Sequence, residues 1–176
     1  MTCIVGFEYN NSVWIGGDSA GVCKDFVSIR SDKKVFINQD YVFGFTGSFR
    51  MGQVLRFRFD PPKWNGTDCL EKFMVVDFID ALKNELKSNS DATEGCTGFL
   101  VGYQGKLFEV DTDYQIAISA YPYTAIGAGK ELAMGSLYTT CSLDMPVEQK
   151  LLTALQVAQE FCSSVREPFY IERMNK

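Results

Sequence analysis

A threonine is the second residue of the chain, directly after the initiator methionine, and its hydroxyl is a potential nucleophile. The chain contains no histidine, so neither a Ser-His-Asp nor a Cys-His site can be built from it. The bases that remain are a lysine, a carboxylate or a free α-amine. Removal of Met1, which the small side chain of Thr2 favours, would free such an amine, whose ordinary pKa of about 7.7–8.0 leaves it partly neutral near pH 7. Thr2 would then supply both the nucleophile and its base.

Two charged residues and one glycine in the first fifty positions could assist this nucleophile. A Lys34 held charged by Asp18 would lower the pKa of the Thr2 hydroxyl and amine, because a nearby cation disfavours a second positive charge. Gly47 lies where a strand pattern gives way to a helix pattern, and its backbone N–H could approach a substrate closely as an oxyanion donor. The plainer interpretation is that these are a turn aspartate, a solvated lysine and a turn glycine.

The elements that would position these residues form two blocks of strands, each followed by two helices. The strand patterns cover residues 2–9, 13–21, 34–38 and 41–47, and then 97–103, 106–111, 114–119 and 123–129. Apolar residues at helical spacing cover residues 49–57, 68–87, 130–140 and 146–165. Separate runs of strands and helices favour an α+β fold. We expect a four-layer αββα sandwich, with two antiparallel sheets between two helical layers, in a single domain over residues 1–176.

Composition narrows the function classes. The 176 residues carry 17 Lys+Arg and 22 Asp+Glu, a net charge of -5 without a basic block, which argues against a nucleic-acid or anionic membrane partner. No apolar stretch could span a bilayer, and the first ten residues lack the features of a signal peptide, so we expect a cytoplasmic protein. The six cysteines are scattered and no histidine accompanies them, so we expect reduced thiols, no metal site and no cofactor.

Four stretches of the chain, in order, resemble the proteasome β-subunit and HslV family of N-terminal-nucleophile hydrolases. Once the initiator methionine is discounted, Thr2, Asp18 and Lys34 reproduce the family's offsets between its N-terminal threonine, strand-end aspartate and lysine. Residues 41–55 are similar to the family's A-G-x-x-A-D-like stretch, and residues 124–137 are similar to its G-S-G-x-x-x-A-x-G segment. The resemblance therefore extends over essentially the whole chain.

This resemblance implies a threonine endopeptidase that attacks a peptide carbonyl and passes through an acyl-enzyme. The implied catalytic residues are Thr2, Asp18, Lys34 and Gly47. The implied substrate-binding residues are Ser19 and the backbone of Gly21, which would pair with an extended peptide, and Phe45, which would wall the pocket for the side chain before the scissile bond. The implied partners are a peptide or unfolded protein substrate, further copies of the chain in a homo-oligomeric ring, and an ATPase unfoldase ring.

Four positions depart from the family's pattern. Ala128 and Lys130 stand where relatives carry serines, and Cys162 and Val165 align with an aspartate and a serine of proteasome subunits. These departures indicate the HslV side of the family, or a divergent member from a phage or a bacterium.

Two other hypotheses stay open. One is a catalytically silent structural ring subunit, because a retained Met1 would make the Thr2 nitrogen an amide that cannot act as a base. The other is an N-terminal-nucleophile amidase or acylase that acts on a small molecule, because a fold alone does not fix a substrate.

Overall fold

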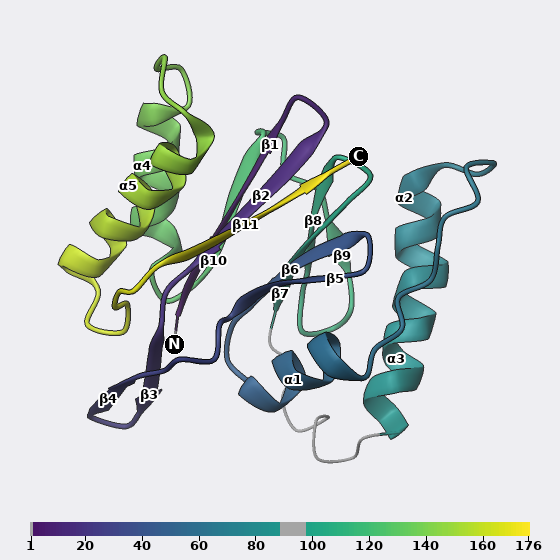
Figure 1. Ribbon diagram of the computed structural model, residues 1–176, viewed down its shortest axis with the longest axis horizontal. Helices are drawn as coiled ribbons and strands as arrows, with labels where there is room; N and C mark the ends of the chain where they lie inside the picture. Colours follow the sequence, from purple (N-terminus) through teal and green to yellow (C-terminus); the bar gives the residue numbers. More distant parts are fainter. Residues whose placement is uncertain (1, 89–97) are drawn as a thin grey trace.

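Two antiparallel β-sheets lie face to face in the computed structural model, which describes residues 2–88 and 98–176 (Figure 1). The first sheet has the strand order β10-β1-β2-β11 and comprises β1 (Cys3–Tyr9), β2 (Ser12–Gly17), β10 (Tyr123–Gly127) and β11 (Tyr170–Asn175). The second has the order β5-β6-β7-β8-β9 and comprises β5 (Val35–Asn38), β6 (Tyr41–Phe45), β7 (Phe99–Tyr103), β8 (Lys106–Val110) and β9 (Ile116–Ala117). A separate hairpin, β3 (Ala20–Cys23) and β4 (Phe26–Ile29), extends away from the sandwich.

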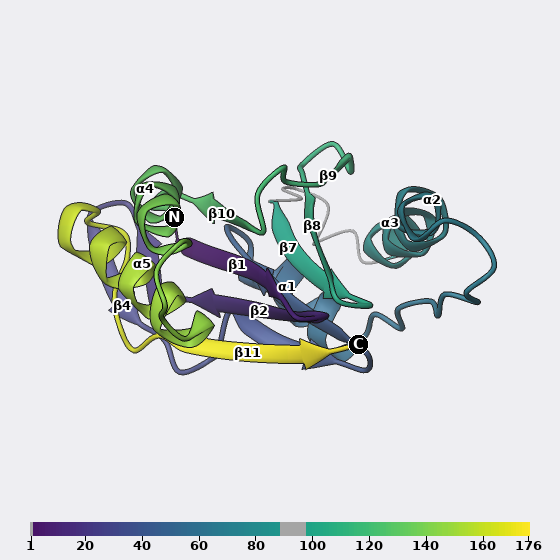
Figure 2. The same ribbon diagram turned by 90° about the horizontal axis from the view of Figure 1, so that it is seen from above.

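The helices form the two outer layers (Figures 1 and 2). The first sheet is covered by α4 (Lys130–Thr140) and α5 (Val147–Phe161). The second is covered by α1 (Phe49–Phe57), α2 (Leu70–Phe73), the π-helical turn η1 (Met74–Phe78) and α3 (Ile79–Ser88). The four-layer αββα sandwich predicted from the sequence is therefore confirmed. None of the helices in the described ranges has both the length and the apolar composition needed to cross a membrane.

Burial on both faces explains the unbroken apolar run at the start of the chain. In β1, Cys3, Val5 and Phe7 pack against α4 and α5, whereas Ile4 packs between the two sheets. Successive side chains of a strand point to opposite faces, so a strand covered on both faces is apolar throughout. Cys3 and Ile4 are fully buried, which fixes the start of β1 and with it the position of Thr2.

Two expectations for individual elements were wrong, and one strand of the first sheet was missed. The strand expected over 13–21 ends at Gly17, because Asp18 turns the chain out of the sheet and into the β3–β4 hairpin. The helix expected over 146–165 ends at Phe161, where Cys162 is extended. The final strand, β11, was not predicted, because its burial alternates only weakly at the edge of the first sheet and its sequence carries little strand signal.

Candidate active site

Three strand ends bring the predicted catalytic residues together. Thr2 directly precedes β1, Asp18 directly follows β2, and Lys34 directly precedes β5. Since β1 and β2 are antiparallel with Ile4 opposite Gly17, the start of β1 and the end of β2 lie side by side. The beginning of β5 in the second sheet faces the same point, because Val35 packs with Ile4 between the two sheets.

Lys34 connects the other two side chains. Its Nζ donates hydrogen bonds to Thr2 Oγ1 at 2.7 Å and to Asp18 Oδ1 at 2.8 Å. The side chains of Lys34 and Asp18 are 1% and 0% exposed, so this ion pair is removed from water. A buried ion pair is tolerated only when its geometry is good and its other hydrogen-bonding groups are satisfied.

The Asp18 carboxylate meets that requirement through backbone donors. Oδ1 accepts the N–H of Cys3 at 3.1 Å, and Oδ2 accepts the N–H groups of Ala20 at 2.9 Å and Arg166 at 3.3 Å. Asp18 thus joins the start of β1, the start of β3 and the segment that leads to β11. These three backbone donors satisfy the carboxylate oxygens of Asp18 inside the protein, beside Lys34.

The surroundings of Lys34 have two opposing effects on the pKa of its ammonium group. Burial lowers the pKa of its ammonium group below the ordinary value, and the charge and hydrogen bond of Asp18 oppose that effect. The ring of Phe49 lies 5.9 Å from Nζ and adds an aromatic face to the site. An ammonium with a lowered pKa, held 2.7 Å from a hydroxyl, can both stabilise negative charge on the hydroxyl oxygen and exchange protons with it.

Two glycines hold the main chain of Thr2 from the other side. The N–H of Gly129 donates to the Thr2 carbonyl at 3.3 Å. Gly127 has a φ of +92°, and a Cβ at that position would lie 2.3 Å from the same carbonyl oxygen. A side chain at position 127 would therefore both strain its own backbone and collide with Thr2. The sequence pattern pointed to this segment, but not to the contact it makes.

Gly47 lies at the exposed turn between β6 and α1, with a φ of +76°. The next residue, Ser48, caps α1 by accepting the N–H of Met51 at 3.1 Å. The preceding residue, Thr46, donates its N–H to the carbonyl of Gly98 at 3.3 Å. The turn is thus anchored on both sides of Gly47, and its role as oxyanion donor stays a prediction.

The hydrogen-bonding groups of Ser19 are used within the chain. Its N–H donates to the carbonyl of Arg166 at 2.8 Å, its hydroxyl donates to the carbonyl of Pro168 at 2.5 Å, and its carbonyl accepts the N–H of Arg30 at 2.9 Å. Ser19 therefore fastens the hairpin to the segment before β11. This places it in a structural role and leaves its predicted pairing with a peptide without support.

Gly21 lies on the β3–β4 hairpin, where register decides which backbone groups face outward. Gly21 pairs with Ser28, and Cys23 pairs with Phe26 across a two-residue turn. In such a hairpin the pair that closes the turn and every second pair beyond it exchange hydrogen bonds. The main-chain groups of Gly21 therefore point toward β4, whereas those of Val22 point toward the open edge. The outward-facing residue missed from the sequence is Val22, and the two-residue turn was the signal that could have located it.

Phe45 lines a small cavity beside α1. It is 3% exposed and contacts Phe49 edge-on, with ring centroids 5.7 Å apart. The cavity has a volume of about 90 Å³ and is also lined by Gln53 and Arg56. Because Phe49 borders both this cavity and Lys34, the cavity lies next to the candidate nucleophile.

The positions that depart from the family's pattern are occupied as follows. Val165 is fully buried in the apolar layer under α5, and Cys162 lies at the end of that helix. The backbone N–H of Arg166, the residue after Val165, donates to Asp18 where a side-chain donor could have done so. Ala128 is exposed at the turn after β10, and Lys130 begins α4. A main-chain donor thus supplies the support for Asp18, which no side-chain pattern could reveal.

Cys3, the neighbour of Thr2, is not a competing nucleophile. It is fully buried, and burial together with the charge of Asp18 raises the pKa of its thiol to about 12. The thiolate is the reactive form of cysteine. We expect iodoacetamide to alkylate Cys3 at least about 10²-fold more slowly at pH 8 than the exposed Cys23 and Cys69. Peptide mass spectrometry over a time course measures this, and comparable rates would show that the start of β1 is open to solvent.

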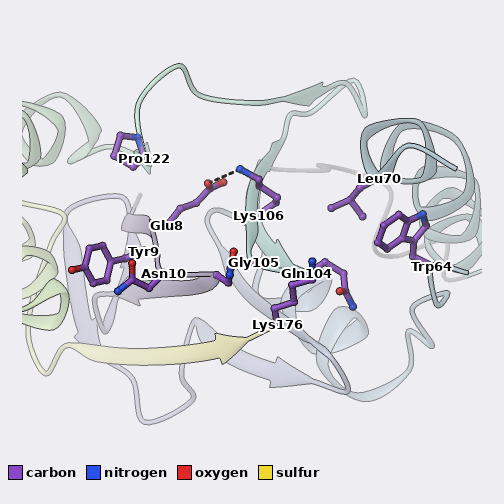
Figure 3. A pocket seen from close by; sticks show the side chains of 11 residues that line it. Glu8, Tyr9, Asn10, Trp64, Leu70, Gln104, Gly105, Lys106, Pro122 and Lys176 are labelled. Atoms are coloured by element: carbon purple, nitrogen blue, oxygen red, sulfur yellow. Dashed lines mark hydrogen bonds and ion pairs between the residues drawn. The ribbon is translucent and has the colours of Figure 1, made fainter. Parts of the chain in front are cut away.

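A larger cavity of about 530 Å³ lies at the opposite end of β1 (Figure 3). It opens between the β1–β2 turn at Asn10 and the β7–β8 turn at Gln104, with Trp64 on its far wall. Lys106 and Glu8 form an ion pair of 3.4 Å at its edge. It contains none of the predicted site residues. Within residues 2–88 and 98–176, no group of three or more acidic or cysteine side chains could hold a metal ion.

Several solved structures have the same four-layer fold as this chain. BPH from Thiobacillus denitrificans has a TM-score of 0.82 at 16% identity, over 99% of this chain and 98% of that chain. The same protein in complex with epoxomicin gives 0.80 at 14% identity, over 99% and 98%. HslV from Trypanosoma brucei gives 0.71 at 18% identity, over 99% and 100%.

Anbu, described as an ancestral beta-subunit, from Yersinia bercovieri gives a TM-score of 0.67 at 16% identity, over 98% of this chain and 81% of that chain. No protein-family model matches the sequence, and no curated protein matches it. The suspected likeness to HslV and proteasome subunits is therefore confirmed at the level of the fold.

Proposed function

We propose that the chain is a threonine-type endopeptidase whose nucleophile, Thr2, is exposed by removal of Met1. The observation that carries the proposal is the buried contact of 2.7 Å between Lys34 Nζ and Thr2 Oγ1, with Lys34 fixed by Asp18. A purely structural lysine would not need to direct its ammonium group at the hydroxyl of the second residue. The likeness to a BPH structure that holds epoxomicin supports the same proposal.

The proposed reaction uses these groups together with the Thr2 α-amine and the Gly47 N–H. The Thr2 Oγ attacks the carbonyl carbon of the scissile peptide bond while the free Thr2 α-amine takes the hydroxyl proton. The N–H of Gly47 stabilises the oxyanion, and Lys34 stabilises the developing charge on Oγ. The proton then passes to the leaving amine as the C–N bond breaks. Water, activated by the same amine, hydrolyses the ester and restores the hydroxyl.

The substrate would lie as an extended strand beside the open edge of β3. Main-chain groups of Val22 face that edge, next to Gly21, and would pair with the peptide. The cavity behind Phe45 would take the side chain before the scissile bond, and its volume of about 90 Å³ favours a small one. These assignments place the peptide across the Thr2 hydroxyl.

We further propose that copies of the chain assemble into a homo-oligomeric ring in the cytoplasm and receive unfolded protein from an ATPase ring. Several large apolar side chains support an assembly, because they are strongly exposed in the single chain: Phe26 is 70% exposed, Phe57 74% and Phe161 73%. HslV-like and Anbu-like neighbours share the fold.

Intact mass and covalent labelling test the proposed activity. We expect protein expressed in cells with normal aminopeptidase to lack one methionine. We also expect it to take up one peptide epoxyketone per chain, on Thr2, because this reagent needs both the hydroxyl and the free amine. Peptide mapping locates the adduct, and a Thr2→Ala variant is the control. Retention of Met1 without an adduct would instead favour a silent ring subunit.

A further inference from the structure

A cavity of about 330 Å³ opens beside the main chain of Thr2 and is distinct from the cavity behind Phe45. The residues of its lining that matter here are Thr46, Glu109, Asp111, Ile126, Gly127 and Lys130. They come from β8, β10, the first turn of α4 and the turns that follow β6 and β8, and none of them was assigned a catalytic or substrate-binding role above.

Backbone contacts place this cavity close to the candidate nucleophile. Gly127 pairs with Cys3 and approaches the Thr2 carbonyl oxygen, and Lys130 follows Gly129, whose N–H donates to the same carbonyl. On the other wall, Thr46 directly precedes the turn at Gly47. The cavity is therefore lined by neighbours of both the nucleophile and the candidate oxyanion donor. If the scissile carbonyl of a peptide lies between Thr2 and Gly47, the adjoining part of that peptide would extend into this cavity.

The cavity is the open end of the layer between the two sheets, where β8 and β10 face one another (Figure 2). On β8, Leu107 packs into the apolar layer, and Glu109, two residues further on the same face, emerges where the layer ends. Glu109 is half-buried and accepts a hydrogen bond of 3.2 Å from the hydroxyl of Thr124 on β10. Burial raises the pKa of its carboxyl group. A carboxylate in this position gains from a cationic partner.

The charges that line the cavity are unequal. Glu109 and Asp111 contribute two carboxylates, whereas Lys130 contributes one ammonium group. The backbone N–H of Thr112 donates to Asp111 Oδ1 at 2.6 Å and orients that carboxylate. Among the described residues, no ion pair within 4.0 Å joins Lys130 to either acid. The lining of the cavity therefore carries one net negative charge, which would favour a cationic ligand over an anionic one.

We propose that this cavity binds the part of the substrate that follows the scissile bond and selects a basic side chain, arginine or lysine, directly after that bond. The guanidinium or ammonium group would lie between Glu109 and Asp111, where charge-assisted hydrogen bonds are strong. The inference rests on the proposed peptidase function for its place in catalysis, but the charge preference of the cavity is a separate property.

Cleavage of matched peptides tests this preference. Three internally quenched peptides share all residues except the one after the scissile bond, which is arginine, alanine or glutamate. We expect kcat/KM to be about tenfold higher for the arginine peptide than for the glutamate peptide. In a Glu109→Gln, Asp111→Asn variant we expect the ratio to fall to one or below, because Lys130 is then the only charged side chain of the lining. Glutamine keeps an oxygen for the Thr124 hydroxyl, so folding is preserved.

The matched control is Asp113→Asn, which removes one exposed negative charge from the same loop outside the cavity lining and should leave the ratio unchanged. A second readout needs no turnover. In saturation-transfer NMR with intact protein, Arg-Ala-Ala-amide should bind more strongly than Glu-Ala-Ala-amide, and only the double variant should lose the difference.

The outcomes separate the two proposals. Equal cleavage of the three peptides, or a preference that survives the double variant, overturns the cavity assignment while leaving the peptidase intact. Cleavage of none of them, with charge-selective binding retained, overturns the peptidase and upholds the cavity as a cation-selective site.

Discussion

Replacing Thr2 by alanine should lower kcat/KM for a peptide substrate by at least about 10⁴-fold, because loss of the nucleophile leaves only binding and oxyanion stabilisation. Alanine, like threonine, is small enough at position 2 for Met1 to be removed. The α-amine is therefore still freed, and the variant lacks only the nucleophilic hydroxyl. Lys34 Nζ loses one acceptor at 2.7 Å but keeps Asp18. We therefore expect the free energy of unfolding to fall by only about 1 kcal/mol. Fluorogenic peptide turnover and urea unfolding measure the two quantities.

Two variants make this result specific to the hydroxyl. Thr2→Ser keeps an oxygen within reach of Lys34 and should retain most of the turnover. Cys3→Ala changes the adjacent buried residue without touching the proposed chemistry, and should lower stability by about 1 kcal/mol while leaving the catalytic rate within a few-fold. Turnover that survives Thr2→Ala but is lost in Cys3→Ala would reverse the assignment of the nucleophile.

The parts of this site that follow from sequence are those set by local patterns. Three local patterns each mark the end of a strand: the apolar run of β1, the aspartate after β2 and the lysine before β5. In a sandwich of two sheets, the ends of paired strands lie close together. The offsets among Thr2, Asp18 and Lys34, which resemble those of HslV and proteasome subunits, predicted a cluster that the structure shows with contacts below 3 Å.

The parts that sequence could not supply depend on long-range backbone contacts. The N–H of Arg166 supports Asp18 across 148 positions, and a backbone donor carries no residue-specific signal. Ser19 has a suitable side chain, but the segment before β11 occupies it. In the sequence, Glu109 is one polar residue of a half-buried strand. Its position beside a cavity becomes evident only when β10 is placed opposite it. In each case the role of the residue depends on which element, distant in the sequence, packs against it. Composition and periodicity do not specify this packing.

The ion pair of Asp18 and Lys34 should respond unequally to loss of either partner. We expect Asp18→Asn to lower the free energy of unfolding by about 4 kcal/mol, because it leaves a buried ammonium without its counter-charge. The amide also offers one accepting oxygen where the carboxylate uses two, so some of the N–H groups of Cys3, Ala20 and Arg166 would face an NH₂ group. Lys34→Met should cost less, about 2 kcal/mol, because the carboxylate keeps all three backbone donors. Urea unfolding at pH 7 measures both.

The pH dependence gives this comparison a second test. Because the pKa of Lys34 is lowered on folding, the unfolded chain binds more protons between the folded-state pKa and the ordinary value of 10.5. Stability rises with pH wherever the unfolded state binds more protons, so the stability of the wild type should increase relative to Lys34→Met as the pH rises toward 10.5. Burial and the charge of Asp18 dominate the pKa of the Cys3 thiol in both proteins, and Lys34 makes the smallest contribution to it. Lys33→Met is the matched control: Lys33 is a partly exposed neighbour paired with Glu172 at 3.3 Å, and its loss should cost at most about 1 kcal/mol. An equal loss in Lys33→Met and Lys34→Met would mean that the buried pair contributes no more than a surface contact, and Lys34 could then not be the fixed cation that activates Thr2.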